Sequence, residues 1–182
     1  RAEIMNNFLI GDNISLSCHK REELDIDWSH IFVSRFMTEH GFTSSKTTNY
    51  QFPLWLYERQ GNKLVNFNKD IYKKVINNLS GEIEPENIFD YIYAFLHSPF
   101  YRKKYKDFLK EDFPKVPYPK NNKDFFNLVE AGRELRTLHL LEDSKISKFI
   151  TTYPLSGDDK VDKIKYNNGK VFINEKQYFG GV

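Results

Sequence analysis

The chain has 182 residues, of which 40% are hydrophobic and 29% are charged, as in an ordinary globular protein. Its single cysteine, Cys18, excludes an internal disulfide framework, and the lack of an apolar run of about 18 residues excludes a transmembrane helix. A net charge of +2 is too small to indicate a nucleic-acid-binding protein by itself. Because the chain starts at Arg1 without a methionine, we expect one domain over residues 1–182 that is truncated at both ends.

The first part of the chain, residues 8–60, is predicted to be rich in strands. Residues 14–18 alternate apolar and polar side chains, which is the period of a half-buried strand. Residues 31–36 and 52–57 are rich in β-branched and aromatic side chains, which favour strands. Between them, the polar residues 41–50 predict a loop of about ten residues, a length at which loops are often functional.

The middle of the chain, residues 68–142, is predicted to form a cluster of four helices. Asn68 and Asn122 are suited to cap the first and the last of these helices. Pro85 suits the first turn of the second, and Ser98-Pro99 both ends that helix and starts the third. The periodicity places these helices at about 68–79, 85–97, 100–111 and 122–141.

The third helix is predicted to bury Tyr101, Tyr105, Phe108 and Leu109. The three prolines that follow it, within residues 113–119, require an extended path.

Residues 160–174 are predicted to form a β-hairpin around Asn167-Asn168-Gly169, because Asn and Gly tolerate the positive φ of a tight turn. The whole pattern predicts an α+β fold with mixed small β-sheets, a central cluster of about four helices and a C-terminal β-hairpin.

No motif for catalysis, metal binding or cofactor binding is found in the sequence. There is no phosphate-binding loop and no dinucleotide fingerprint, and no two histidines have the spacing of a helical zinc site. His97 and His139 lie in apolar surroundings and are interpreted as structural. The sequence therefore predicts no catalytic residue, no metal ligand and no cofactor in this part of the protein.

Basic residues cluster in and after the third predicted helix. Residues 100–120 hold seven Lys or Arg against three acids. Four of them surround the helix, namely Arg102, Lys103, Lys104 and Lys106. This pattern is typical of a helix laid along a phosphate backbone, and equally of the solvated face of an amphipathic helix.

The polar loop allows two similar interpretations. Its short hydroxyl, amide and ammonium side chains suit contacts with phosphates and base edges, and they also suit an ordinary surface loop. They are Ser44, Ser45, Lys46, Thr47, Thr48 and Asn49.

Three longer stretches resemble one known family. Residues 52–57, FPLWLY, resemble its FPLYLY signature, and residues 88–113 resemble its block IFxYIYAxLHSPxYRxxYxxFLxxDF. Residues 125–141, with Gly132 and the LHLL end, resemble the continuation of that block. The family is the C-terminal target-recognition region of type ISP single-chain restriction-modification enzymes and related adenine-N6 DNA methyltransferases.

This resemblance implies a domain that recognises a specific sequence in duplex DNA. It implies an upstream methyltransferase domain that transfers a methyl group from S-adenosylmethionine to adenine N6, possible nuclease and motor domains, and a bacterial, cytoplasmic enzyme without a membrane partner. The present sequence lacks the Asn-Pro-Pro-Tyr type methyltransferase motif, so we expect no enzymatic activity and no cofactor in this part.

The family block is mostly apolar and is interpreted as scaffold. Base contacts are then expected in stretches without a family signature, for which Lys20, Arg21 and residues 44–49 are the candidates, while Arg102, Lys103, Lys104 and Lys106 position phosphates. Arg102 also matches the family block and suits a structural role. Two alternatives stay open: a docking module within the same large enzyme, and an independent nuclease, for which no acidic metal cluster is found.

Overall fold

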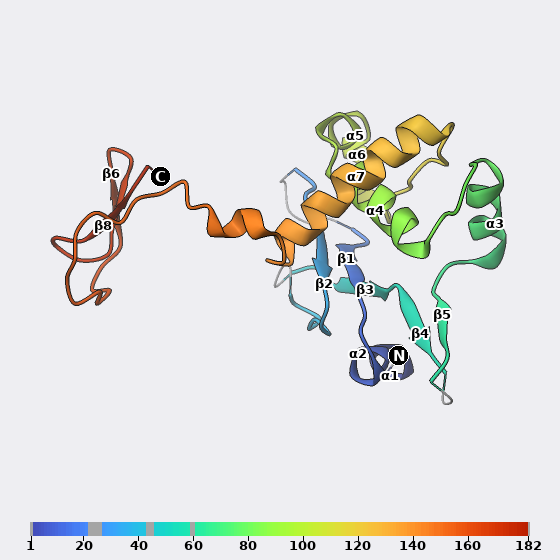
Figure 1. Ribbon diagram of the computed structural model, residues 1–182, viewed down its shortest axis with the longest axis horizontal. Coiled ribbons are helices and arrows are strands. Elements are labelled where there is room, and N and C mark those ends of the chain that lie inside the picture. The colour runs from blue at the N-terminus through green and yellow to red at the C-terminus, as the bar shows by residue number, and fades with distance from the viewer. Residues whose placement is uncertain (1, 22–26, 43–45, 59–60, 182) are drawn as a thin grey trace. The chain divides into compact units, whose positions relative to one another are not determined.

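The computed structural model describes residues 2–21, 27–42, 46–58 and 61–181 (Figure 1). The chain divides into two compact units, Arg1–Glu142 and Asp143–Val182. The first unit holds two small sheets and the helical cluster, and the second holds a third sheet. These three antiparallel sheets and the helices confirm the predicted α+β fold class.

A three-stranded antiparallel sheet forms the centre of the first unit. Its middle strand β1 (Ser15–His19) pairs with β2 (Ile31–Ser34) on one side and with β3 (Asn49–Pro53) on the other. Because side chains alternate across a strand, Leu16 and Cys18 point to one face, where they pack against the apolar core. The other side chains of β1 are polar and occupy the opposite face.

The prediction of a single strand over residues 52–57 is wrong, because these residues belong to two strands in two different sheets. β3 ends at Pro53, and β4 (Trp55–Tyr57) pairs with β5 (Lys63–Val65) in a separate hairpin. Between them Leu54 is buried, and its amide donates to the carbonyl of Ile14 at 2.8 Å. Two short helices, α1 (Ala2–Met5) and α2 (Asn7–Ile10), precede β1 and were not predicted.

The helical cluster follows the predicted order. It consists of α3 (Lys69–Asn77), α4 (Pro85–His97), α5 (Pro99–Lys104), α6 (Lys106–Glu111) and α7 (Asn122–His139). Asn68 caps α3 as predicted, whereas α7 is capped by Asn121 and not by Asn122, since the Asn121 side chain accepts from the amide of Asp124. Figure 1 shows α7 running across α4.

The third predicted helix is interrupted. The backbone leaves the helical region at Tyr105, with φ −111° and ψ 22°, so that α5 and α6 are separate one-and-a-half-turn helices. Tyr101 and Leu109 are buried as predicted, but Tyr105 is 37% exposed and Phe108 is 72% exposed. The prediction that Tyr105 and Phe108 are buried is therefore wrong, and α6 buries Leu109 alone of its residues.

The close contact of α4 with α7 forms the core of the cluster. A Cβ atom on Gly132 of α7 would lie 2.0 Å from the carbonyl oxygen of Asp90 in α4, so only glycine fits there. Asp90 is fully buried, and its carboxylate accepts two hydrogen bonds from Arg136, at 2.6 and 3.0 Å. The fully buried rings of Tyr93 and Phe125 fill the space on either side.

The second unit is a small three-stranded sheet. After a 3-10 turn (Ser144–Ser147), β6 (Lys165–Asn167) and β7 (Lys170–Phe172) form the predicted hairpin, and β8 (Tyr178–Gly180) adds a third strand that was not predicted. Asn168 and Gly169 adopt φ of 48° and 71°, as a tight hairpin turn requires. Among the described residues, no helix has the length and apolarity needed to cross a membrane.

Candidate nucleic-acid interface

Two of the predicted contact segments meet at one end of the central sheet. Lys20 and Arg21 follow the end of β1, and Thr47 and Thr48 precede the start of β3. Because the two strands are antiparallel with His19 opposite Asn49, these segments lie side by side although they are far apart in the sequence. They line a shallow pocket of about 240 Å³, the basic pocket, formed by Lys20, Arg21, Thr47, Thr48 and Tyr50.

The loop residues divide into outward and inward side chains. Lys46 is exposed and Thr48 is half-buried, whereas Thr47 is only 6% exposed. The Thr47 hydroxyl lies 2.9 Å from Nδ1 of His19, and the Asn49 amide group donates to the Thr38 hydroxyl at 2.9 Å. The side chains of Thr47 and Asn49 thus bond within the protein, whereas Lys46 is exposed and Thr48 lines the basic pocket. Ser44 and Ser45 lie outside the described residues.

The basic pocket borders an aromatic surface. The ammonium of Lys20 lies 5.9 Å from the centre of the Phe113 ring, and Tyr50 meets the same ring edge-on at 5.0 Å. Phe113 also belongs to a second, mainly apolar cavity of about 600 Å³ between α5, α6 and the proline-rich segment. This apolar pocket is lined by Tyr101, Tyr105, Phe108, Leu109, Glu111, Asp112, Phe113, Pro114, Lys115, Val116 and Pro117.

The four basic side chains of α5 and α6 have different surroundings. Lys103 and Lys104 are exposed. Lys106 forms an ion pair with Asp27 at 2.7 Å, which lowers the pKa of the Asp27 carboxyl. The guanidinium of Arg102 donates to the carbonyl of Leu96 at 2.7 Å and lies over the Trp28 ring. This geometry favours a structural role for Arg102 and leaves Lys103 and Lys104 as the most accessible cations of this cluster.

Sequence reasoning missed His19 and His30. His19 is fully buried and stacks on His30, with ring centres 4.3 Å apart and an interplanar angle of 16°. The available signal was the run Ser15, Ser17 and His19, polar at every second position of a strand whose other positions are apolar. That alternation indicates a polar face, but it does not reveal that the loop covers this face.

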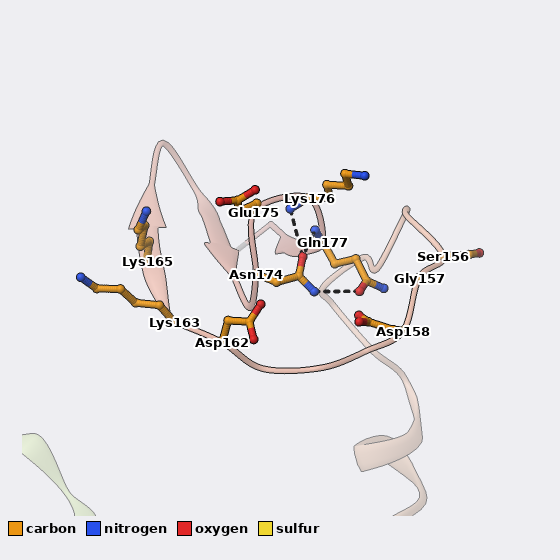
Figure 2. Close-up of a pocket in the computed structure, with 10 residues that line it drawn as sticks. All are labelled: Ser156, Gly157, Asp158, Asp162, Lys163, Lys165, Asn174, Glu175, Lys176 and Gln177. Atoms are coloured by element: carbon orange, nitrogen blue, oxygen red, sulfur yellow. Dashed lines mark hydrogen bonds between the residues drawn. The ribbon is translucent and has the colours of Figure 1, made fainter.

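A cavity of about 640 Å³ lies within the second unit, which holds none of the predicted contact residues (Figure 2). Its central polar groups bond to one another: Asn174 donates to the Gln177 side chain at 2.8 Å, and Gln177 donates to Asp159 at 2.7 Å. Figure 2 shows Lys163 and Lys165 pointing away from this centre. The inner surface is therefore already occupied by internal hydrogen bonds, and we do not regard it as the functional site.

Metal-ligating side chains are not clustered within the described ranges. In them, no three His, Cys, Asp or Glu side chains are grouped so that they could hold a metal ion. Cys18 is buried, and burial raises the pKa of its thiol to about 12, so it is not a nucleophile at neutral pH.

Comparison with known proteins gives one family and several similar folds. The family model described as Type ISP C-terminal specificity domain matches residues 1–182. A comparison with curated proteins gave no match.

Three solved structures of low sequence identity share the fold. They are a DrdV–DNA complex (23% identity, TM-score 0.71), the ATP-dependent Type ISP restriction-modification enzyme LlaBIII bound to DNA (20%, 0.74), and a nuclease-deletion mutant of the Type ISP enzyme LlaGI with a DNA substrate mimic (24%, 0.68). The matches cover 94%, 93% and 94% of this chain, but only 18%, 11% and 15% of the respective larger chains.

Proposed function

The chain belongs to the Type ISP C-terminal specificity domain family, and from this membership we propose that it recognises a specific sequence in duplex DNA. The observation that carries the proposal is the basic pocket, where Lys20 and Arg21 meet the loop before β3. Similar folds were solved as parts of enzymes bound to DNA, which supports DNA as the partner.

The geometry gives the pocket residues different tasks. Lys20 and Arg21 are exposed cations that attract phosphates, and Arg21 has the planar fork that suits bidentate contact with guanine. Lys46 and Thr48 project from the loop beside them and suit contacts with base edges. Ser44 and Ser45, in the same loop, remain candidates for such contacts.

A second set of basic side chains contacts the phosphates and holds the duplex in place, but does not distinguish one sequence from another. Lys103 and Lys104 are exposed on α5 and can neutralise phosphates at any sequence. Lys106 is already paired with Asp27, and Arg102 is bonded inside the protein, so we assign both a smaller share of the affinity.

The reaction itself is assigned to other parts of the whole enzyme. This chain matches only 11–18% of the length of the three similar proteins, which are therefore several times longer. By the family resemblance, we propose that an upstream domain methylates adenine N6 with S-adenosylmethionine and that the whole enzyme works in the bacterial cytoplasm. The present chain then supplies the DNA sequence preference.

Fluorescence anisotropy tests the proposal with two duplexes: a recognition duplex, which carries the sequence that the wild-type protein enriches from a pool of random duplexes, and a scrambled duplex of the same composition. Replacing Lys103 and Lys104 by Gln should raise Kd for both duplexes alike and reduce the salt dependence by about one unit of slope per lysine. Replacing Lys46 by Gln, or Thr48 by Val, should reduce the difference between the two duplexes. An unchanged preference in both loop variants would contradict the assignment of the loop.

One observation favours a second candidate function, docking within the same large enzyme. The apolar pocket is open at the surface, and Phe108, 72% exposed, stands at its edge. Exposed apolar surface of this kind often marks a protein contact. In the full-length protein, Phe108→Glu should then expose new protease sites between domains, whereas it should leave proteolysis unchanged if the domain acts through DNA alone.

A further inference from the structure

A layer of buried polar groups lies beneath the loop of the basic pocket. Ser15, Ser17 and His19 of β1 are all fully buried, on the face turned away from the apolar core. Asn49 and Gln51 of β3 lie on the same face, because they pair with His19 and Ser17. We call these five residues the polar layer. The described residues between β2 and β3, 35–42 and 46–48, form a covering segment whose Phe36, Thr38 and Thr47 bond to the polar layer.

Gln51 holds the first part of this covering segment. Its Nε2 donates to the Ser15 hydroxyl at 2.8 Å and to the carbonyl of Phe36 at 2.7 Å. Its Oε1 accepts from the amide of Thr38 at 2.9 Å. One side chain thus bonds two backbone groups of the segment that leaves β2.

His19 and Asn49 hold the other end. The Thr47 hydroxyl bonds to the His19 ring at 2.9 Å, and the ring is fixed from its other side by the stack on His30. The backbone amide of Asn49 donates to the carbonyl of His40 at 3.0 Å, which closes the loop on itself.

The hydrogen bonds of Gln51 and His19 fix the position of the loop more closely than apolar contacts would. Apolar burial is non-directional, whereas a hydrogen bond specifies the position of both partners within a few tenths of an ångström. Thr47 is bonded inward, and it stands between Lys46, which is exposed, and Thr48, which lines the basic pocket. Within the polar layer, it is therefore His19 and Gln51 that set where Lys46 and Thr48 stand at the basic pocket.

We propose that His19, acting through Thr47, and Gln51 are positioning residues that determine which DNA sequence the loop prefers. They touch no DNA themselves. This inference rests on the proposed function, since it concerns how the same pocket distinguishes one duplex from another. It predicts that sequence preference depends on side chains fully or partly buried beneath the surface that meets DNA.

The test is a double-mutant cycle on the full-length protein with Thr47→Val and His19→Phe. Thr47→Val keeps the shape and removes the hydroxyl, and His19→Phe keeps an aromatic ring against His30. Ser17→Ala is the matched control. Its hydroxyl is buried on the same face, but it lies 3.5 Å from the Thr38 hydroxyl, at the limit of a hydrogen bond, and it is not bonded to Lys46, Thr47 or Thr48 of the described loop residues.

Two measurements are made on each variant. The first is the ratio of Kd values for a recognition duplex and a scrambled duplex, together with the salt slope. The second is hydrogen exchange at the amide of Asn49, which reports the closure of the loop without any DNA.

Thr47→Val should reduce the Kd ratio about tenfold and accelerate exchange at Asn49 by a similar factor, with the affinity for scrambled DNA and the salt slope unchanged. In the His19→Phe background, Thr47→Val should have no further effect, and Ser17→Ala should behave like the wild type. The proposal is overturned if Thr47→Val keeps both the ratio and the protection, or if it weakens binding to both duplexes equally. A wild-type protein without any preference contradicts the proposed function instead, while the exchange measurement still decides whether His19 and Thr47 hold the loop.

Discussion

The contact of α4 with α7 and the polar layer beneath the loop are both built around buried polar groups, but in different surroundings. Asp90 and Arg136 lie between two helices whose apolar side chains pack closely around them. His19, Thr47 and Gln51 instead join a polar sheet face to a single covering segment. The first arrangement stabilises the fold, and in our proposal the second selects one position of a loop. The proposal therefore assigns stability and specificity to different residues.

The largest effect is expected where the scaffold loses its buried charge pair. Asp90→Ala leaves the guanidinium of Arg136 without its partner in a site that is largely closed to water. Removing one member of a buried pair costs about 3–5 kcal/mol of the free energy of unfolding. Urea denaturation measures this loss, and Glu130→Ala on the exposed face of α7 is the control, with an expected change within about 0.5 kcal/mol. Equal stabilities for the two variants would show that the pair does not hold the helices.

The next largest loss of stability is expected where α7 and α4 approach each other most closely, at Gly132. Gly132→Ala places a methyl group against the backbone oxygen of Asp90, which cannot move aside as a flexible side chain would. We expect a loss of about 3 kcal/mol, although alanine alone favours a helix over glycine by about 1 kcal/mol. The neighbouring change Ala131→Gly should cost only about 1 kcal/mol in the same denaturation experiment. A stabilised Gly132→Ala variant would contradict the close contact.

A pH-dependent effect follows from His97 at the end of α4. Burial, the Arg102 guanidinium and His139 lower the pKa of His97 from its usual 6.5 to about 4. Between these values the unfolded chain binds a proton that the folded chain does not, so the free energy of unfolding should fall as the pH decreases from about 6.5 to about 4.

The contribution of His97 is at most about 2 kcal/mol, because solvent still reaches part of the ring. Denaturation at several pH values should show a shallower slope for His97→Gln than for the wild type. The exposed His40→Gln is the control and should keep the wild-type slope. Identical slopes in all three proteins would disprove the role of His97.

The smallest effect on stability is expected for a substitution in the polar layer. The same substitution should have a large effect on the preference for one DNA sequence over another. Gln51→Met removes the hydrogen bonds to Phe36 and Thr38, but water can replace them because that segment is partly exposed. We expect a loss of about 1 kcal/mol in the free energy of unfolding and a marked loss of preference between duplexes. A large loss of stability with unchanged preference would reverse the comparison between the two regions.

Sequence patterns predicted those elements whose structure is determined by residues close to one another in the sequence. The 3.6-residue periodicity gave α4 and α7, and the turn chemistry of Asn168 and Gly169 gave the hairpin of β6 and β7. The division of the strand at Leu54 was missed because it depends on a distant contact, the bond of the Leu54 amide to Ile14. The break at Tyr105 was missed as well, since the apolar pattern continues through it.

The candidate site was predicted in part. Lys20, Arg21 and the loop were named from the sequence, but their meeting depends on the register of β1 and β3, which residue types alone do not specify. The inward direction of Thr47 depends on His19 in another strand. The Thr47 hydroxyl could bond to a phosphate or to a buried histidine, so the sequence alone does not show which partner it has.

The most direct test of DNA recognition is selection from a pool of random duplexes by the full-length protein at two salt concentrations, repeated with Lys20→Gln and Lys46→Gln. We predict enrichment of one short sequence that survives the higher salt, and a weaker or altered enrichment in the variants. Binding without enrichment, lost steeply as salt increases, would contradict sequence recognition, and no binding at either salt concentration would favour the docking function instead.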